Sequence, residues 1–352
     1  MVIMAIGLVN VFSATTGRGI VEGTTASEMA IRQLVHLATG LGIIGVLMLV
    51  DYRLIERISY VIYGINLFAL ALVPLIGSVR YGARRWINLG FMVYQPSETM
   101  KLAVILALSR YFHNKSSLSK MGFRDLLVPG LILGVPGLLT IIQPDLGTGG
   151  HMLIAGTVLL LFVGVRPRIL WSMVIVGIVS FPLAWQYGLK SYQKDRIRTF
   201  LDPMQDPRGN GYNAIQSMIA VGSGETFGKG YQKGTQTQLD FTPEGHTDFI
   251  FTVLAEEWGL VGALLLLGLY LALLQRCVTV ASLARDKFGS LVCVGIIAML
   301  TSQIFINISM VCGMFPIVGI PLPLVSYGGT SVMNVCLALG ILLNVGYKRT
   351  IF

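Results

Sequence analysis

Apolar runs of about 20 residues recur along the whole chain and are separated by polar segments. An α-helix of this length crosses a bilayer and satisfies its own backbone hydrogen bonds. Strands of a membrane barrel need only about ten residues and alternate in polarity, so a barrel is excluded. The pattern predicts an all-α, polytopic integral membrane protein of about ten helices, near residues 1–14, 29–50, 57–77, 97–113, 125–142, 148–165, 169–186, 248–275, 290–312 and 327–346.

One polar segment, residues 187–247, is much longer than the others. Between 191 and 222 its apolar residues have helical spacing beside polar neighbours, which predicts two short amphipathic helices lying at the membrane surface. Glycines then recur up to residue 234 and indicate irregular backbone. The sequence predicts one transmembrane domain, 1–352, with this segment as its single long extracytoplasmic loop.

Composition and charge agree with a membrane protein and fix its expected orientation. Only 12% of the residues are charged, about half the fraction of a soluble protein. The net charge of +9 does not indicate nucleic-acid binding, because cytoplasmic loops of membrane proteins are enriched in Lys and Arg. With ten spans both termini share one side, which is predicted to be cytoplasmic from the basic residues of the loops 51–57, 113–124, 166–168, 276–289 and 347–352.

The sequence predicts neither a disulfide framework nor a zinc site. All four cysteines lie in apolar runs and are interpreted as packing residues. His246 stands apart from other ligand types, so zinc binding is not expected. The first apolar run is short for a span, and we expect that residues precede Met1 in the natural chain.

Ionisable residues inside apolar runs are costly, so they are functional hypotheses by default. Glu98 and Lys101 lie three apart at the start of the fourth span, on one helix face, with Pro96 and Ser97 as a plausible cap. They are either a structural ion pair or part of a site. Asp145 lies in the connection between two spans and is either the N-cap of the next helix or a binding residue.

Asp248 is the carboxylate that the sequence singles out. It opens a long apolar run, which places it at the outer mouth of the eighth span. Asp favours a helix N-terminus for electrostatic reasons alone, and that is the alternative to a functional role. Glu256 and Glu257 follow inside the run and either tune the site or stabilise helix packing.

Three arginines, Arg80, Arg84 and Arg85, lie in the short external loop 78–95. This placement opposes the orientation bias, so an anionic ligand is expected there unless the arginines only contact lipid headgroups. Near the C-terminus, Pro321 and Pro323 followed by Gly328 and Gly329 predict non-helical backbone at membrane depth. Phosphate-loop, nucleophile-elbow and HExxH motifs are absent, so nucleotide hydrolysis and serine or zinc proteolysis are not supported.

Several motifs together resemble those of the SEDS family (shape, elongation, division and sporulation). They occur in the expected order and cover essentially the whole chain: WINLG at 86–90, QPSETMK at 95–101, QPDLGTG at 143–149, GTQTQLDFTPEGHTDFIFTVLAEEWGLVG at 234–262, Asn307, and LVSYGGTS at 324–331. Pro321 and the stretch 236–239 resemble the elongation-type members, RodA, more than the division-type members, FtsW.

The resemblance implies a bacterial peptidoglycan glycosyltransferase with ten spans in the cytoplasmic membrane. It would polymerise lipid II at the outer face, with inversion at the anomeric carbon, during cell elongation and shape maintenance. Asp248 matches the essential aspartate of the family and is the expected base, although it could instead orient the hydroxyl or hold a divalent cation (Mg²⁺ or Mn²⁺). The residues expected to bind substrate are Arg84, Arg85, Trp86, Glu98, Lys101, Asp145, Gln238, His246 and Ser326.

Two other functions remain compatible with these residues. A polar cavity with intramembrane charges would also serve a lipid II flippase. The resemblance further implies a class B penicillin-binding protein as partner, so the chain could serve as its scaffold. We expect the loop 187–247 to act as a lid and guide over the substrate cavity.

Overall fold

The structure is a computed structural model. It describes residues 1–352 apart from 17–24, 81–82, 89, 91–92, 116–121, 167, 170, 173–174, 176–178, 181, 183, 189–190, 208, 210, 240, 242–243 and 349–352. Within the seventh predicted span, 169–186, residues 170, 173–174, 176–178, 181 and 183 lie outside the described residues.

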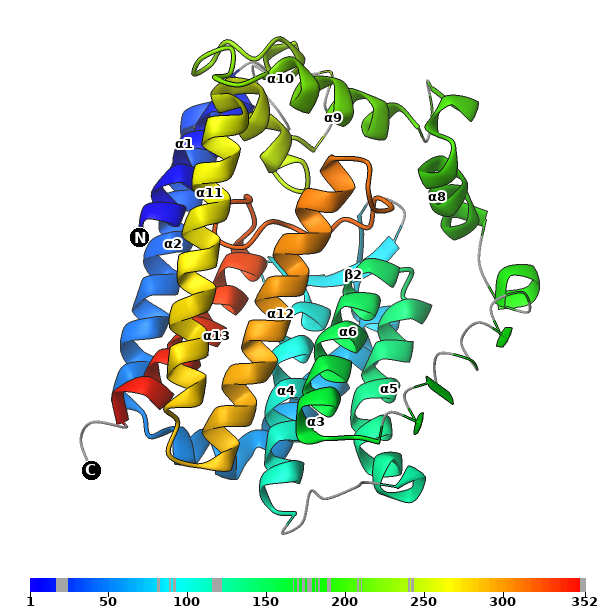
Figure 1. The fold of residues 1–352 in the computed structure, drawn as a ribbon, viewed down its shortest axis with the longest axis vertical. Helices are drawn as coiled ribbons and strands as arrows, with labels where there is room; N and C mark the ends of the chain where they lie inside the picture. The colour runs from blue at the N-terminus through cyan, green and yellow to red at the C-terminus, as the bar shows by residue number, and fades with distance from the viewer. Residues whose placement is uncertain are drawn as a thin grey trace. The chain divides into compact units, whose positions relative to one another are not determined.

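In the described part of the chain, helices stand at the other nine predicted spans (Figure 1). These helices are α1 (Val2–Thr16), α2 (Ala26–Leu49), α3 (Tyr52–Ile76), α4 (Pro96–His113), α5 (Leu127–Ile142), α6 (Leu146–Val163), α11 (Ile250–Ser282), α12 (Lys287–Val311) and α13 (Gly329–Lys348). Six of them are long and apolar enough to cross a bilayer, and α1 and α5 are shorter apolar helices. The predicted all-α membrane fold is confirmed.

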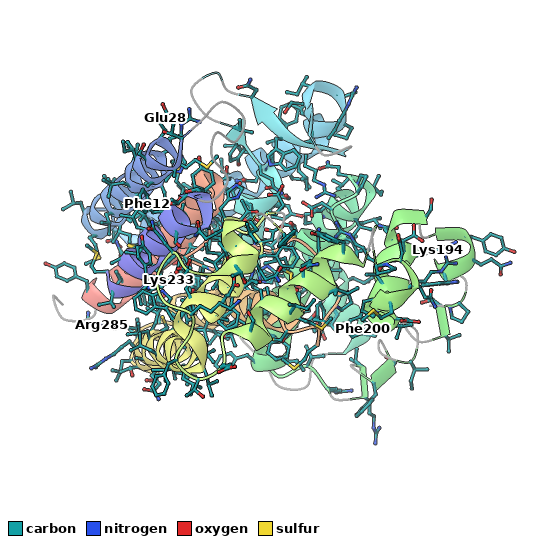
Figure 2. The ribbon with its side chains drawn as sticks, turned by 90° about the horizontal axis from the view of Figure 1, so that it is seen from above. Phe12, Glu28, Lys194, Phe200, Lys233 and Arg285 are labelled. Atoms are coloured by element: carbon teal, nitrogen blue, oxygen red, sulfur yellow. The ribbon has the colours of Figure 1, made fainter. Side chains whose placement is uncertain are left out.

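The long loop contains the two helices that its spacing predicts. They are α8 (Ser191–Leu201), which carries Lys194 and Phe200 (Figure 2), and α9 (Tyr212–Ser223). Among its described residues, the glycine-rich part that follows holds one helical turn, α10 (Thr235–Gln238).

The chain divides into two compact units. The first unit consists of Met1–Ile43, Tyr192–Arg276 and Gln303–Cys336, and the second of Ile44–Ser191, Cys277–Ser302 and Leu337–Phe352. In the second unit α4 is the central helix and packs against α3, α5 and α6 (Figure 1). Its side chains are buried along almost its entire length, in a core that includes Met100, Val104, Leu108 and Phe112.

The loop 78–95, which is predicted to be external, contains a small antiparallel sheet. Its strands are β1 (Ser78–Arg80), β2 (Ala83–Asn88) and β3 (Val93–Tyr94), in the order β1-β2-β3. Trp86 pairs with Ser78, whose hydroxyl donates to the Trp86 carbonyl at 3.2 Å. The sheet places Arg84, Arg85 and Trp86 consecutively on β2.

Three loops that were predicted to share one side do meet in the second unit. The Tyr52 hydroxyl donates to Asp286 Oδ1 at 2.8 Å, and Lys287 Nζ donates to the Lys115 carbonyl at 2.8 Å. These bonds join the segments 51–57, 113–124 and 276–289. The assignment of this side to the cytoplasm stays a prediction.

Helix α11 is interrupted at Gly259, which has φ +64° and ψ −162°. Residues 225–230 of the long loop, here called the strap, lie in the break. Backbone N–H groups of Lys229 and Gly230 donate to the carbonyls of residues 256 and 257 at 3.0 and 2.9 Å. The N–H groups of residues 260 and 261 donate to strap carbonyls at 2.9 and 3.1 Å. The strap therefore satisfies the backbone groups that the break leaves without intrahelical partners.

Candidate active site

Asp248 lies in the first unit, at the end of a turn that leads directly into α11 at Ile250. The side chain is half-buried. Its carboxylate lies beside Gly319, because a Cβ atom built on that glycine would stand 3.2 Å from Asp248 Oδ2. Gly319 also has a positive φ of +73°, so a side chain there would be strained as well as crowded.

The three backbone carbonyls that lead into α11 are each held by a residue of the C-terminal motifs. Tyr327 N–H donates to the His246 carbonyl at 2.9 Å, and the Ser326 hydroxyl donates to the Thr247 carbonyl at 2.6 Å. Asn307 Nδ2 donates to the Asp248 carbonyl at 2.8 Å. The position of the Asp248 backbone is thus fixed by side chains and backbone far away in sequence.

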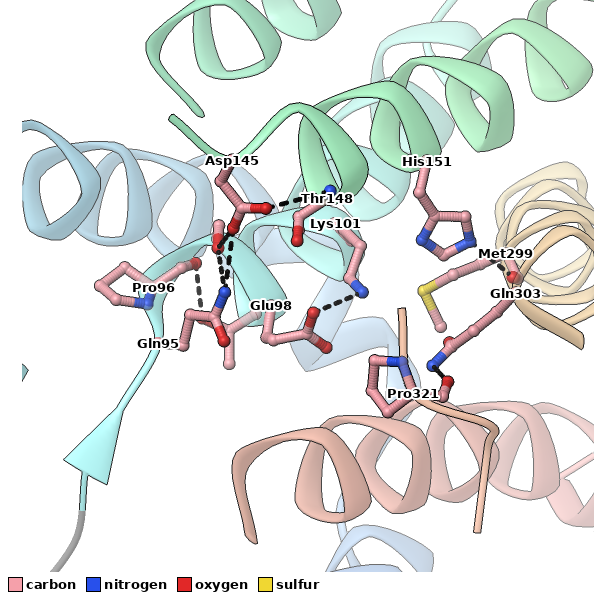
Figure 3. Close-up of polar contacts among 12 residues, drawn as sticks. Gln95, Pro96, Glu98, Lys101, Asp145, Thr148, His151, Met299, Gln303 and Pro321 are labelled. Carbon is pink, nitrogen blue, oxygen red and sulfur yellow. Dashed lines mark hydrogen bonds and ion pairs between the residues drawn. The ribbon is translucent and has the colours of Figure 1, made fainter. Parts of the chain in front are cut away.

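The predicted non-helical segment 319–328 is confirmed, and its polar groups are satisfied in the protein. Ser326 Oγ accepts from Leu322 N–H at 2.7 Å, and Gln303 Nε2 donates to the Pro321 carbonyl at 2.8 Å (Figure 3). The buried Tyr270 hydroxyl donates to the Pro323 carbonyl at 2.6 Å. Ser326 is 3% exposed, and both of its hydroxyl bonds go to backbone, which favours a positioning role for this residue.

Asn307 supplies the first prediction. Its Nδ2 bridges the carbonyls of Asp248 and Ile320, at 2.8 and 2.7 Å, from a fully buried position. Asn307→Leu leaves both carbonyls without this donor, at a cost of about 1–3 kcal/mol for each buried group. We expect a lower melting temperature and reduced activity, measured on the purified protein. Asn334→Leu is the control at another buried Asn, and an equal loss of activity in both would contradict the positioning role.

Two aromatic contacts lie beside the same turn. The rings of His246 and Tyr327 are 5.8 Å apart, and those of His36 and Tyr327 are 6.0 Å apart. Gln33 Nε2 from α2 donates to the Ser326 carbonyl at 3.2 Å. Helix α2 therefore supports the LVSYGG turn from the N-terminal part of the first unit.

Gln238 and the two glutamates of α11 form hydrogen bonds that join the long loop, α1 and α11. Gln238 Nε2 donates to the Ser13 carbonyl at 3.3 Å. Glu256 is completely buried, pairs with Lys229 Nζ at 2.8 Å, and accepts from the N–H groups of residues 236 and 237. Glu257 Oε1 accepts from the Ser13 hydroxyl at 2.5 Å. These contacts favour the packing interpretation of both glutamates.

The second unit contains a separate polar cluster at the starts of α4 and α6 (Figure 3). Asp145 is the N-cap of α6 and accepts from Thr148 N–H at 3.3 Å, so the expected capping role is confirmed. Its other oxygen accepts from Gln95 Nε2 at 3.0 Å and from Ser97 Oγ at 3.5 Å. Pro96 stands at the first position of α4, whereas the N-cap is Gln95 and not Ser97.

Glu98 and Lys101 form the expected ion pair on one face of α4. Lys101 Nζ lies 2.8 Å from Glu98 Oε1, and the two residues are 2% and 5% exposed, respectively (Figure 3). Further along the neighbouring helix, His151 Nε2 shares a hydrogen bond with the Met299 carbonyl at 2.9 Å. A buried pair of this kind is costly to break but weak evidence for stability on its own.

A double-mutant cycle can decide whether the Glu98–Lys101 pair is structural or belongs to the active site. Lys101→Met alone leaves an unpaired buried carboxylate, and we expect a loss of about 3–5 kcal/mol of stability. Glu98→Leu with Lys101→Met removes both charges and should recover most of that loss. If the folded double variant has normal activity, the pair is only structural. If it is stable but inactive, the charges belong to the site.

The residues of β2 differ in their surroundings. Arg84 is exposed and donates to the Pro74 carbonyl at 3.1 Å. Arg85 donates to the Pro144 carbonyl and lies 3.9 Å from Asp145 Oδ1. Trp86 is half-buried. On β3, burial raises the pKa of the Tyr94 hydroxyl above its usual value, so this group stays protonated and donates to Asn66 Oδ1 at 3.2 Å.

The expected site residues therefore fall into two groups. Asp248 lies with His246, Gln238 and Ser326 in the first unit. The second unit brings Asp145 together with Arg85 and places the Glu98–Lys101 pair on the neighbouring helix.

A family model described as "Cell cycle protein", that of FtsW, RodA and SpoVE, matches residues 1–351. The chain belongs to this family. It is the SEDS family that the sequence motifs predict. The peptidoglycan glycosyltransferase MrdB of Escherichia coli is 39% identical to this SEDS chain over 326 residues, which cover 90% of the chain and 85% of MrdB.

Two solved structures share the fold over nearly their whole length. RodA of Thermus thermophilus has a TM-score of 0.73 at 30% identity, covering 99% of this SEDS chain and 94% of RodA. A chain from a study of how a peptidoglycan synthase complex coordinates polymerisation and crosslinking has a TM-score of 0.79 at 32% identity, covering 100% and 96%. MrdB and RodA agree with the predicted elongation-type resemblance.

Sequence reasoning missed the residues that hold Asp248 and the loop in place. The motif order gave no sign that Ser326, Tyr327 and Asn307 bind three successive carbonyls. The strap's bonds to α11 were also not expected. The repeated glycines of the long loop were the one available signal of a close approach between backbone segments. At Gly224, for example, an added Cβ would stand 1.9 Å from the Ala255 carbonyl oxygen, so only glycine fits there.

Proposed function

We propose that this SEDS chain is a peptidoglycan glycosyltransferase that polymerises lipid II into glycan strands. The observation that carries the proposal is the fixed position of Asp248. Three successive carbonyls at the entrance to α11 are each held by a residue of the family motifs, so the carboxylate has a defined place at a helix start. The names of MrdB and of the peptidoglycan synthase complex support the same activity.

The reaction needs one group that accepts or directs a proton. The hydroxyl of the acceptor sugar attacks the anomeric carbon of the donor, the bond from that carbon to the lipid diphosphate breaks, and the configuration inverts. Diphosphate is already a good leaving group, so the paired carboxylates of glycoside hydrolases are not required. We assign Asp248 as the group that orients the attacking hydroxyl and accepts its proton.

The leaving diphosphate requires positive charge. Guanidinium groups bind phosphate oxygens in a bidentate manner. Arg84 is exposed, while Arg85 is half-buried and weakly paired with Asp145, so both retain donors for an anion. Lys101 is fully engaged with Glu98 and contributes to a diphosphate site only if that pair opens.

A divalent cation is compatible with Asp248. Mg²⁺ commonly keeps several waters and takes one or two carboxylates together with substrate phosphates. Asp248 supplies one carboxylate at the end of the long loop, which is the smallest number of protein carboxylates that commonly binds Mg²⁺. A bound ion would add positive charge beside the diphosphate, and the Asp248 carboxylate would hold the ion in place.

The chain is a multi-pass membrane protein, and we assign it to the bacterial cytoplasmic membrane with both termini in the cytoplasm. We also propose a class B penicillin-binding protein as partner, because the related complex joins polymerisation to crosslinking. The loop 187–247 is proposed to guide the lipid substrate. Deletion of 191–222 from a folded protein would then impair polymerisation, and unchanged polymer yield would contradict this role.

Polymerase and flippase activities are separated by reconstitution in liposomes with labelled lipid II, with and without the partner. We expect lysozyme-sensitive glycan polymer that depends on the chain. Translocation of labelled lipid without polymer, in the presence of the partner, would favour a flippase. If polymer forms equally well without this chain, the chain is not the polymerase, and the scaffold function is favoured.

A further inference from the structure

Three side chains outside the proposed site converge at helix ends of the second unit. They are Glu56 in the first turns of α3, His113 at the end of α4, and Asp286 just before α12. One ligand atom from each lies within 4.8 Å of the others. None of them belongs to the motifs that carry the family resemblance.

The local charge balance of this cluster calls for a cation. One carboxylate comes from α3 and the other from the segment just before α12, and in the described residues neither of them forms an ion pair with Lys or Arg. The neighbouring cations bind elsewhere: Lys287 donates to the Lys115 carbonyl, Lys115 pairs with Asp125, and Arg110 donates to the carbonyls of residues 56 and 57. The imidazole of His113 is the only basic group within ion-pair distance of the cluster carboxylates in the described part of the chain.

The geometry fits metal coordination. His113 Nε2 lies 3.4 Å from Glu56 Oε1. In a tetrahedral site with bonds of about 2.1 Å, two ligand atoms stand about 3.4 Å apart. The ligand atom of Asp286 lies within 4.8 Å of the ligand atoms of both Glu56 and His113.

Surrounding groups contact two of the three side chains. The Tyr52 hydroxyl donates to Asp286 Oδ1 at 2.8 Å, and Phe288 packs edge-on against the His113 ring, with centroids 6.3 Å apart. In the described part of the chain, His113 Nδ1 is buried and has no hydrogen-bond partner. Hydrogen bonds and packing behind the ligands fix ligand orientation in metal sites.

We propose that Glu56, His113 and Asp286 bind one divalent first-row transition-metal ion, of the class of Zn²⁺ or Mn²⁺. One imidazole with two carboxylates suits these ions, whereas Mg²⁺ and Ca²⁺ prefer oxygen ligands alone. The ion joins the start of α3, the end of α4 and the start of α12. It is a structural tie on the side predicted to be cytoplasmic, and it takes no part in the transfer reaction.

The test uses the full chain in detergent or nanodiscs after treatment with a chelator. Mn²⁺ binding is followed by electron paramagnetic resonance, and Zn²⁺ binding by the shift of the melting temperature, with Mg²⁺ as the comparison ion. We expect one ion per chain, a rise in melting temperature with Zn²⁺, and coupling to one imidazole nitrogen in pulsed spectra. Affinity should fall at least about tenfold in Glu56→Gln, His113→Gln and Asp286→Asn.

Asp125→Asn is the matched control, because Asp125 is an acidic residue near the same helix end but is paired with Lys115. It should bind metal as the unchanged chain does. The nitrogen coupling is measured on the unchanged chain, so the test does not depend on the variants folding. Absence of stoichiometric binding, lack of nitrogen coupling, or equal affinity in His113→Gln would overturn the proposal.

Discussion

Asp248→Asn is expected to lower the rate of lipid II polymerisation at least about a hundredfold, because a general base contributes about 10²–10⁴ to a rate. The amide keeps the shape of the side chain but cannot accept a proton. The backbone bonds from Asn307, Ser326 and Tyr327 are unaffected, because they go to carbonyl groups of the main chain. The rate is measured with purified protein, its partner and lipid II, from the yield of glycan polymer over time.

The control for Asp248→Asn must separate chemistry from folding. Asp125→Asn makes the same chemical change at a partly exposed residue of the other unit and should leave the rate unchanged. The melting temperature of Asp248→Asn should stay close to that of the unchanged chain. A normal polymerisation rate in a folded Asp248→Asn protein would refute the base assignment, while a low melting temperature would point to a structural effect.

Gly259→Ala is expected to have the largest effect on folding. The backbone at residue 259 has φ +64° and ψ −162°, a region that is essentially restricted to glycine and costs other residues about 1–3 kcal/mol. The added Cβ would also stand 2.3 Å from Gly228 N, so the strap would have to move. We expect a large drop in the melting temperature and in the yield of folded protein by size-exclusion chromatography.

Gly268→Ala is the matched control for Gly259→Ala, since it makes the same change in the same helix. A Cβ at residue 268 meets nothing within 4 Å. Ala should therefore be neutral there, or stabilising by up to about 1 kcal/mol through helix propensity. An unchanged melting temperature in Gly259→Ala would show that the break in α11 is not required for the fold.

The apolar pattern was sufficient to predict the helices because bilayer thickness dictates their length. Capping chemistry was also readable, as Asp145 and Pro96 show, since a cap depends on neighbours three or four residues away. The break at Gly259 could not be read from the sequence. A glycine in an apolar run has the same appearance whether the helix continues or stops, and only the strap decides between these outcomes.

The sequence was sufficient to predict the residue types of the candidate site. It was not sufficient to predict the residues that hold Asp248 in place. Asp248 could be singled out because a carboxylate at the mouth of a span is uncommon. Its link to Asn307 crosses 59 positions of sequence, and the pattern of polar residues carries no information on that pairing. The same reason hid the cluster of Glu56, His113 and Asp286, whose members come from three segments far apart in the sequence.

The strap has a further consequence for the way the chain can be divided. Residues 225–230 precede α11 in sequence and supply hydrogen-bond partners for residues 256–261. Two co-expressed fragments separated between α8 and α9 would keep the strap and α11 on one polypeptide, and each could insert with its backbone groups satisfied. Fragments separated between 231 and 249 would send the second one into the bilayer with an open break in its first helix. Only the first pair is expected to reassemble into working protein.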